Sequence, residues 1–346
     1  MNQRIIISVI VPVYNAENTI VKCFEALEKQ TMKNIEVIYI DDGSTDNSYN
    51  ILKKLCKSAK TSKVVSQTNG GPSKARNTGI VMAGGEFLMF CDSDDIVEAN
   101  WCEKLYKVFQ KEKCLTICHM ARENSEGIIQ WSTLEQYWPI RNRSVEMIAI
   151  SKINLLYKAQ LLNSPCNKLY KSSVIKENNI KFVENLNLGE DLIFNIRYIV
   201  CAKEKYVSVV NEVLYRYIMI NEESLTQKYR DDYIENQHII FEKLIYFFEK
   251  CEIEDEAFFR ELYYDYFFLL YNYFSEYICN NQHSFIYKAN YLTQILKNDT
   301  LLNKAYEICS FEQDSKIFVK VIQCKNYYII WLFEKCWRII EWLRGK

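Results

Sequence analysis

Residues that break regular secondary structure are scarce in this chain of 346 residues, which has nine glycines and four prolines. Six of the glycines lie between Gly43 and Gly85, no proline follows Pro165, and no glycine lies between Gly189 and Gly345. Because glycine and proline mark turns, this distribution predicts short elements in the first half and long helices in the second. The length is typical of about two domains.

Other shortages exclude several classes of function. Three histidines and thirteen cysteines without a CxxC pair argue against a zinc site or a disulfide framework, and fit free thiols in a reducing cytoplasm. A net charge of -1 provides no basic field for nucleic acid. No run approaches ~18 uncharged apolar residues, so no membrane-spanning helix is expected. The apolar run at 5–11 stops at Pro12 and is interpreted as a strand, not a signal peptide.

An acidic cluster, Asp92-Ser93-Asp94-Asp95, directly follows the apolar run at 87–91. Such a run is typical of a buried central strand, which would fix the carboxylates at the carboxyl end of a sheet. Like charges are unfavourable there unless a cation lies between them, and oxygen ligands suit Mg²⁺ or Mn²⁺. The alternative is a solvated acidic turn that caps the next helix.

The first ninety residues alternate between strand and helix patterns. Polar clusters follow each predicted strand at the edge where open α/β sheets bind ligands, and the alternation predicts a mostly parallel sheet with helices on both faces. Neither a dinucleotide-binding glycine fingerprint nor a GxxxxGK[ST] loop is present. The predicted strands cover 5–11, 35–40, 64–66 and 87–91, and the helices cover 16–30, 46–55 and 74–83.

Seven motifs resemble glycosyltransferase family 2, and the first four come in that family's order and at its usual spacing. The resemblance covers roughly residues 5–226 and implies the GT-A fold, which is Rossmann-like with a mostly parallel sheet and flanking helices. The motifs are ISVIVPVYN (7–15), DDGSTD (41–46), NGGPSKARNTGI (69–80), DSDD (92–95), NKLYKSSV (167–174), GEDLIFNIR (189–197) and LYRYIMINEESLT (214–226).

The resemblance implies a donor site on the first motifs. Pro12, Tyr14 and Glu17 would border the nucleoside. Asp42 would accept the uracil N3–H, which favours uridine or thymidine nucleotides because that edge is not a donor in cytosine. Asp41 is expected only to brace its turn.

The remaining donor-side roles fall on one helix and on the acidic cluster. Lys74 and Arg76 would pair with the diphosphate, unless they form a solvated helix face. Asp92 would hold the ribose, and Asp94 would bind Mn²⁺ or Mg²⁺ to neutralise the leaving group. Asp95 would ligate through water or buttress the loop.

The acceptor side is assigned to the GED motif. Asp191 would be the general base, although its position in a first helical turn also suits a simple helix-dipole charge. Glu190 would contact the acceptor or orient Asp191. Lys168 would reach phosphate or acceptor, or be a surface lysine.

The helical remainder, 227–346, carries no recognisable motif. The segment 257–274 is apolar nearly all round and predicts a central bundle helix. The segment 327–344 resembles an interfacial helix on the cytoplasmic leaflet, with packing against the helical region or a dimer interface as alternatives. Its apolar face would be Ile329, Leu332, Phe333, Cys336, Ile340 and Leu343, and its polar face Glu334, Arg338 and Glu341.

These observations predict a catalytic domain at 1–226 and a helical domain at 227–346. The function expected is inverting, metal-dependent transfer of a hexose or N-acetylhexosamine from a nucleotide-diphosphate sugar, with UDP favoured. The acceptor would be a glycan or lipid-linked saccharide of the cell surface, such as a capsule, and the enzyme would be cytoplasmic or peripheral on the inner membrane face. A nucleotidyltransferase would need a glycine-rich triphosphate loop, which is absent. A degenerate sugar-nucleotide-binding scaffold is the alternative, and the oligomeric state is open.

Overall fold

The computed structural model divides the chain into two compact units. The first comprises Met1–Tyr229 with Tyr246–Ile253, and the second comprises Arg230–Ile245 with Glu254–Lys346. The predicted boundary at 226 lies outside the described residues. The structure describes 4–124, 127–130, 134–138, 143–184, 186, 188–219, 233–279, 283–309 and 315–344, without the side chains of 129, 130, 275, 276, 279, 315–318 and 338–344.

The first four strands form the parallel part of the sheet, in the order β3-β2-β1-β4. Their β-branched and aromatic residues make β1, β2 and β4 almost wholly buried, as expected for strands covered on both faces. The strands are β1 (Ile7–Val13), β2 (Ile35–Asp41), β3 (Ser62–Ser66) and β4 (Phe87–Phe90), and they alternate with α1 (Ile20–Glu28), α2 (Ser48–Ser58) and α3 (Gly71–Met82).

Beyond β4 the sheet becomes mixed, which the strand patterns did not predict. β9 (Lys168–Lys171) pairs antiparallel with both β4 and β6 (Thr116–Asn124), while β6 runs parallel to β10 (Tyr206–Ile218). Three short strands pair antiparallel at the margins: β5 (Ile96–Val97), β7 (Gly127–Gln130) and β8 (Val145–Ala149). The helices of this part are α4 (Trp101–Glu112), α5 (Asn154–Lys158), α6 (Ser172–Glu177) and α7 (Glu190–Ala202).

The strand order fixes where a ligand can bind. The chain runs outward from β1 to β3 and returns to place β4 on the other side of β1, so the order reverses between β1 and β4. Open α/β sheets bind ligands outside the carboxyl ends of the strands at such a switch point. Tyr14, which follows β1, and Asp92, which follows β4, therefore flank the expected crevice.

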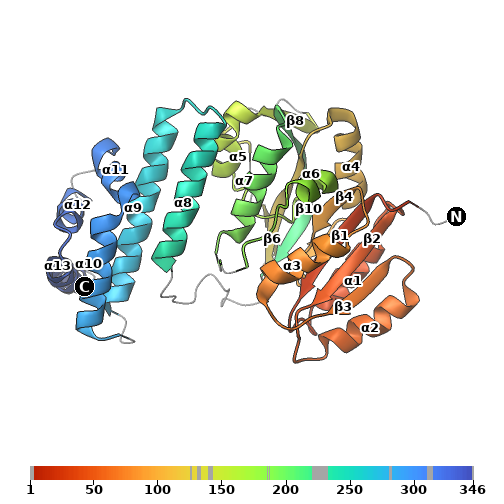
Figure 1. Cartoon of the computed structure of the whole chain (residues 1–346), viewed down its shortest axis with the longest axis horizontal. Helices are drawn as coiled ribbons and strands as arrows, with labels where there is room; N and C mark the ends of the chain where they lie inside the picture. The colour runs from red at the N-terminus through yellow and green to blue at the C-terminus, as the bar shows by residue number, and fades with distance from the viewer. Residues whose placement is uncertain are drawn as a thin grey trace. The chain divides into compact units, whose positions relative to one another are not determined.

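The second unit is helical, as Figure 1 shows in its blue and cyan parts. The predicted bundle helix corresponds to α9, whose core face includes Leu262, Phe267 and Leu270. Among the described residues, none of the helices is long and apolar enough to span a bilayer. The helices are α8 (Tyr233–Lys250), which the two units share, α9 (Glu256–Cys279), α10 (Phe285–Asn298), α11 (Thr300–Ile308), α12 (Ser315–Gln323) and α13 (Tyr327–Arg344).

Candidate active site

Two loops at the carboxyl edge of the sheet are hydrogen-bonded to each other. The side-chain oxygen of Asn15 accepts from the Thr45 amide at 2.8 Å, and the Glu17 carboxylate accepts from the Asn47 amide at 3.0 Å. Tyr14 lies between these contacts and β1, with 52% of its surface exposed. The loop after β1 is thus held rigidly, while the Tyr14 ring stays accessible to a ligand.

Asp42 is buried and anchors the loop that begins α3. Its carboxylate accepts hydrogen bonds from Gln67 at 2.7 Å, from the Gly70 amide at 3.0 and 3.1 Å, and from the Gly71 amide at 2.7 Å. Gly71 has a φ of +86°, a conformation that favours glycine. In this structure Asp42 therefore organises the loop, and its contact with a uracil stays a prediction.

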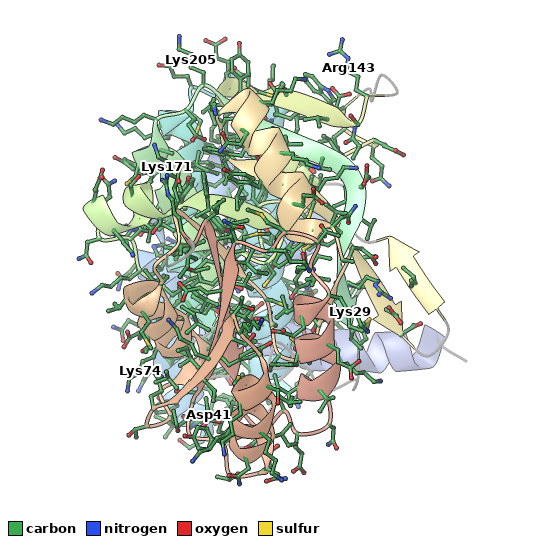
Figure 2. All side chains as sticks on the ribbon, turned by 90° about the vertical axis from the view of Figure 1, so that its right-hand side faces the viewer. Lys29, Asp41, Lys74, Arg143, Lys171 and Lys205 are labelled. Atoms are coloured by element: carbon green, nitrogen blue, oxygen red, sulfur yellow. The ribbon has the colours of Figure 1, made fainter. Side chains whose placement is uncertain are left out.

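Asp41 and Lys74 lie at the same edge. Asp41 is buried and accepts from the Ser66 hydroxyl at 2.8 Å, which ties β2 to β3. The Lys74 side chain passes close to Gly70: a Cβ at position 70 would lie 2.2 Å from the Lys74 Cδ, so a larger residue there would require the lysine to move. Figure 2 shows Asp41 and Lys74 toward one end of the molecule and Lys171, which pairs with the amino end of β4, away from it.

Arg76 joins the two halves of the site. One guanidinium nitrogen donates to Asp92 at 2.9 Å and another to Asp191 at 3.0 Å. The Arg76 side chain is buried, and its guanidinium carbon lies 5.3 Å from the centre of the Phe182 ring. Burial lowers the Arg76 pKa, but the two carboxylates outweigh that effect and hold the pKa well above its usual value. Arg76 is therefore a permanent buried cation and not the solvated helix residue of the alternative interpretation.

Asp191 stands in the first turn of α7, after Gly189, whose φ of +80° starts the helix sharply. Burial raises the pKa of Asp191 to about 7; the Glu190 and Asp92 charges add to this, while Arg76 opposes it. A carboxylate with a pKa near neutrality is suited to accept a proton in a reaction. Glu190 occupies the preceding position in the same turn.

The acidic cluster after β4 divides into one buttress and one open carboxylate. Asp95 is buried, with one oxygen accepting from the Tyr215 hydroxyl at 2.6 Å and the other from the Ile218 amide at 3.0 Å. The Tyr215 hydroxyl also accepts from the Asp92 amide at 3.1 Å. Asp95 thus buttresses the loop, one of its two predicted roles.

Asp94 differs from Asp95 because its side chain is exposed. Partial loss of water around it and the Asp92 charge raise the pKa of Asp94 to about 6. Among the described residues, no group of three or more His, Cys, Asp or Glu side chains is arranged to hold a metal. An open carboxylate of this kind fits the usual Mg²⁺ arrangement, in which one or two carboxylates act together with substrate phosphates.

Two residues near the site were not assigned, or were assigned wrongly, from the sequence. The Cys166 thiol lies 3.6 Å from the second oxygen of Asp92 and can donate to it. Lys168 is fully buried, and its ammonium donates to the Leu161 and Ser164 carbonyls and to Asn167. The prediction that Lys168 reaches phosphate or lies on the surface is therefore wrong: it cross-links its own loop. Burial lowers its pKa to about 7.

Arg76 thus joins Asp92 and Asp191, while Asp42 and Lys74 lie at the loop that begins the same helix, α3. A cation between two carboxylates, a near-neutral Asp191 and an open Asp94 can bind a phosphorylated ligand and accept one proton from a nucleophile. Sequence patterns missed Tyr215 and Cys166, although Tyr215 lies in one family-like segment and Cys166 directly precedes another. Trp131, another aromatic residue of this unit, lies outside the described residues.

Known proteins are similar to this chain in sequence and in fold. The family model described as glycosyl transferase family 2 matches residues 8–178. EpsH of Bacillus subtilis strain 168, named as a glycosyltransferase, is 34% identical over 239 residues, 68% of this chain and 67% of its own length. Glycosyltransferase GlyG of Streptococcus pneumoniae is 30% identical over 216 residues, 61% of this chain and 70% of its own.

A longer relative and a solved structure extend the comparison. A poly(ribitol-phosphate) beta-glucosyltransferase of Bacillus spizizenii is 33% identical over 215 residues, 60% of this chain but 32% of its own length. The crystal structure of S. aureus TarS 1-349 in complex with UDP-GlcNAc has a TM-score of 0.69 and 22% identity, and the match covers 96% of this chain and 91% of TarS 1-349. This likeness confirms the predicted GT-A fold and the helical region after it. The chain therefore belongs to glycosyltransferase family 2.

Proposed function

We propose that this glycosyltransferase moves a hexose or N-acetylhexosamine from a UDP-sugar to a glycan or lipid-linked saccharide, with inversion and with the help of a divalent metal. The observation that carries the proposal is Arg76, which binds both Asp92 and Asp191. Asp92 belongs to the predicted donor side and Asp191 to the predicted acceptor side. One guanidinium thus holds the two carboxylates that would face each other across a reacting sugar.

The choice of uridine rests on two supports. TarS, which has the same fold, was crystallised with UDP-GlcNAc and with UDP. In this chain, the acidic residue at the base-reading position is Asp42, whose oxygens face the amides of Gly70 and Gly71. A carboxylate has about four acceptor positions, and Gln67 and the two loop amides provide three donors, so one position remains for a uracil N3–H. Tyr14, Pro12 and Glu17 would border the same nucleoside.

The reaction would proceed by direct displacement. Asp191 accepts the proton of an acceptor hydroxyl as that oxygen forms a bond to the anomeric carbon. The bond from this carbon to the diphosphate oxygen breaks, and the electron pair leaves with the nucleoside diphosphate. Attack from the side opposite the leaving group inverts the configuration. Glu190 would bind or orient the acceptor, and Arg76 would keep Asp191 in place and favour its ionised form.

The leaving diphosphate needs positive charge. Asp94 would hold Mn²⁺ or Mg²⁺, which, when bound, neutralises charge on the leaving diphosphate. Lys74 supplies a further cation, because its ammonium lies near the Gly70 loop and no residue that the structure describes binds it in an ion pair. Each terminal nitrogen of Arg76 gives one hydrogen bond to a carboxylate, so Asp92 and Asp191 balance its charge while its other N–H groups stay without these partners. We therefore assign the main phosphate contact to Lys74, and we propose that Arg76 positions the two carboxylates and contacts the diphosphate through its remaining N–H groups.

The enzyme would act in the cytoplasm or on the inner membrane face, in the synthesis of a cell-surface polysaccharide. The twelve cysteines whose side chains are described are free thiols, which suits a reducing compartment. The similarity to a poly(ribitol-phosphate) beta-glucosyltransferase supports a polymeric acceptor. The alternative, a scaffold that binds sugar nucleotides without transfer, is disfavoured because Asp92, Asp94 and Asp191 are all present and Arg76 pairs with two of them.

A thermal-shift panel with UDP, dTDP, GDP and CDP, each with and without Mn²⁺, tests the donor site. Ligand at a hundredfold excess over its dissociation constant adds about 2.7 kcal/mol to stability. We expect a Mn²⁺-dependent shift with UDP that Asp94→Ala abolishes. No shift with any nucleotide would contradict the proposal. Nucleotide binding without turnover of any UDP-sugar, even to UDP and free sugar, would favour the scaffold.

A further inference from the structure

Large apolar side chains are exposed at one place in the helical unit. The structure describes seventeen exposed large hydrophobic residues, and six of them belong to two short segments. One segment is the first turn of α10 and the other is the first half of α13, which packs against α10. The six residues, here called the α10–α13 surface, are Phe285, Ile286, Tyr287, Tyr328, Ile329 and Leu332.

Ring contacts make this surface continuous. The Phe285 ring lies 5.5 Å from that of Tyr328 and 5.4 Å from that of Trp331. Ile286 is 69% exposed and Leu332 is 58% exposed. Figure 1 shows α10 and α13 adjacent within the helical unit. A contiguous exposed apolar patch of this kind marks an interaction site.

The face of α13 that packs inward is not the apolar face predicted from the sequence. Tyr327, Ile330 and Glu334 are buried, whereas Ile329 and Leu332, from the predicted apolar face, are exposed. Glu334 had been assigned to the polar face. The helix thus packs inside its own unit through a face that includes a glutamate, and turns apolar residues outward. Packing of the predicted apolar face into the helical core is excluded for these residues.

The helices that carry or support this surface are positively charged. By sequence, α10, α12 and α13 together contain seven lysines and arginines and two glutamates. Lys288 and Glu334 are both buried, so neither adds its charge to the surface. Lys297, Lys320 and Lys335 are exposed. An apolar surface with tyrosine and tryptophan on helices that expose lysines suits the headgroup region of an anionic bilayer.

We propose that the α10–α13 surface docks the enzyme on an anionic lipid bilayer. A second copy of the chain is the weaker occupant, because a two-fold dimer would bring the same positive face of two molecules together. The surface contains none of the residues assigned to catalysis. The proposal specifies how the peripheral location proposed above would arise, and it does not depend on the donor or the metal.

Vesicle flotation with the full chain tests this surface. We expect binding to vesicles of phosphatidylcholine with phosphatidylglycerol, weaker binding to phosphatidylcholine alone, and weaker binding at high salt. The double variant Ile329→Glu/Leu332→Glu should lower the partition coefficient by about tenfold or more, since each change removes a large apolar contact. Ile286→Glu, on α10, should also weaken vesicle binding. This variant provides the test if the double variant folds poorly.

A matched control is available in the same unit. Ile239 on α8 is 42% exposed, close to the 44% of Ile329, and Ile239→Glu should bind vesicles like wild type. Wild type that fails to float with anionic vesicles, or α10–α13 variants that float unchanged, would overturn the proposal. So would wild type that is dimeric by light scattering and becomes monomeric in the double variant without vesicle binding. The Mn²⁺-dependent UDP shift is measured separately, so that failure of the surface and failure of the donor site are distinguished.

Discussion

The two units of this chain differ in what they bury and in what they expose. The first unit buries charged side chains at the carboxyl edge of its sheet, among them Arg76, Asp95 and Lys168. The second unit buries aromatic and aliphatic residues along α9, and it also buries Lys288, Asp299 and Glu334; unlike the first unit, it exposes a group of apolar residues on α10 and α13. Buried charges and exposed apolar groups are both costly for a protein whose only task is to fold. The cluster of buried charges at the sheet edge therefore marks the chemical site, and the exposed apolar surface marks a contact site.

The cost of buried charge explains why the charged residues at the carboxyl edge of the sheet form so many hydrogen bonds and ion pairs. An uncompensated buried ion destabilises a fold by several kcal/mol, so each ion needs a partner with good geometry. Arg76 has two carboxylates, Asp95 has a hydroxyl and an amide, and Lys168 has three oxygens. Arg76 and Asp95 have partners more than a hundred positions away, whereas the partners of Lys168 lie within seven positions of it. The site is thus held in place by the same contacts that make its charges tolerable.

The largest effect is expected when the proposed base is removed. Asp191→Asn should lower the rate of sugar transfer by about 10²–10⁴, because the amide cannot accept the acceptor proton. The Mn²⁺-dependent thermal shift with UDP should remain. Radiolabelled transfer and thermal shift on the same sample measure both quantities.

The matched control is Glu103→Gln, which changes an acidic residue in the first turn of α4. If first-turn carboxylates act only through the helix dipole, the two substitutions should have similar small effects. If transfer by Asp191→Asn is close to that of Glu103→Gln, Asp191 is a structural charge and the assignment of the base is wrong.

The next effect concerns stability, and it tests the second unit. Leu270 is completely buried on α9, and Leu270→Ala should lower the free energy of unfolding by about 2–5 kcal/mol. Leu332→Ala, at an exposed leucine, should change it by about 0.5 kcal/mol or less. Calorimetry on both variants measures the contrast. A large loss of stability in Leu332→Ala would mean that the α10–α13 surface is part of the core after all.

The sequence predicted the parallel half of the sheet because the patterns that identify its strands and turns lie within short segments. The apolar run 87–91 predicted β4, and the glycines of the Asn69–Gly71 loop predicted the turn before α3. The antiparallel pairing of β9 with β4 and β6 depends on partners about eighty and fifty residues away, which no periodicity records. Local patterns predict elements, whereas long-range pairing decides which edges meet.

The sequence also could not predict which side chains form ion pairs and hydrogen bonds with each other. The sequence placed Arg76 and Asp191 at the correct edge, but it could not show their ion pair, which spans 115 positions. Lys168 was expected to reach phosphate or acceptor, or to lie on the surface, because no sequence pattern indicates that its own loop folds around the ammonium. On α13, the helical period identified the apolar face but could not tell which face turns inward. That choice depends on α10 and α12, against which the helix packs.

The pH dependence of transfer sharpens the comparison at the chemical site. Burial raises the pKa of Asp191 to about 7, and the base must be ionised, so kcat/KM should rise with pH up to about 7 and then level off. Arg76 lowers this pKa, so in Arg76→Gln the rise of kcat/KM should occur at higher pH. A pH profile of kcat/KM recorded from pH 5 to 9 on wild type and on the variant measures both midpoints. An unchanged midpoint in Arg76→Gln would show that Arg76 does not affect the protonation of Asp191.

The smallest effect is expected at a titratable cluster inside the helical unit. His238 lies 3.5 Å from an oxygen of the buried Asp299 and 3.2 Å from an oxygen of Glu242. The hydrogen bond to Asp299 raises the pKa of His238; burial opposes this, and the two carboxylate charges support it. Asp299 also caps α11, since it accepts from the Leu302 amide at 2.8 Å. The protonated imidazole thus links α8 to the start of α11.

The sign of the pH dependence follows from the direction of that shift. The folded state binds the proton more tightly, so the extra stability is fully present below pH 6.5 and is lost as pH rises through the raised pKa. Because His238 is partly exposed, we expect a contribution of about 0–1 kcal/mol. His238→Gln should flatten the fall in unfolding temperature between pH 6 and 8.5. His283, also in the helical unit, provides the control, and His283→Gln should leave that fall unchanged. If the unfolding temperature of both variants decreases with pH as in wild type, protonation of His238 beside the buried Asp299 does not stabilise this unit. The two units would then differ in whether their buried charges contribute to the fold.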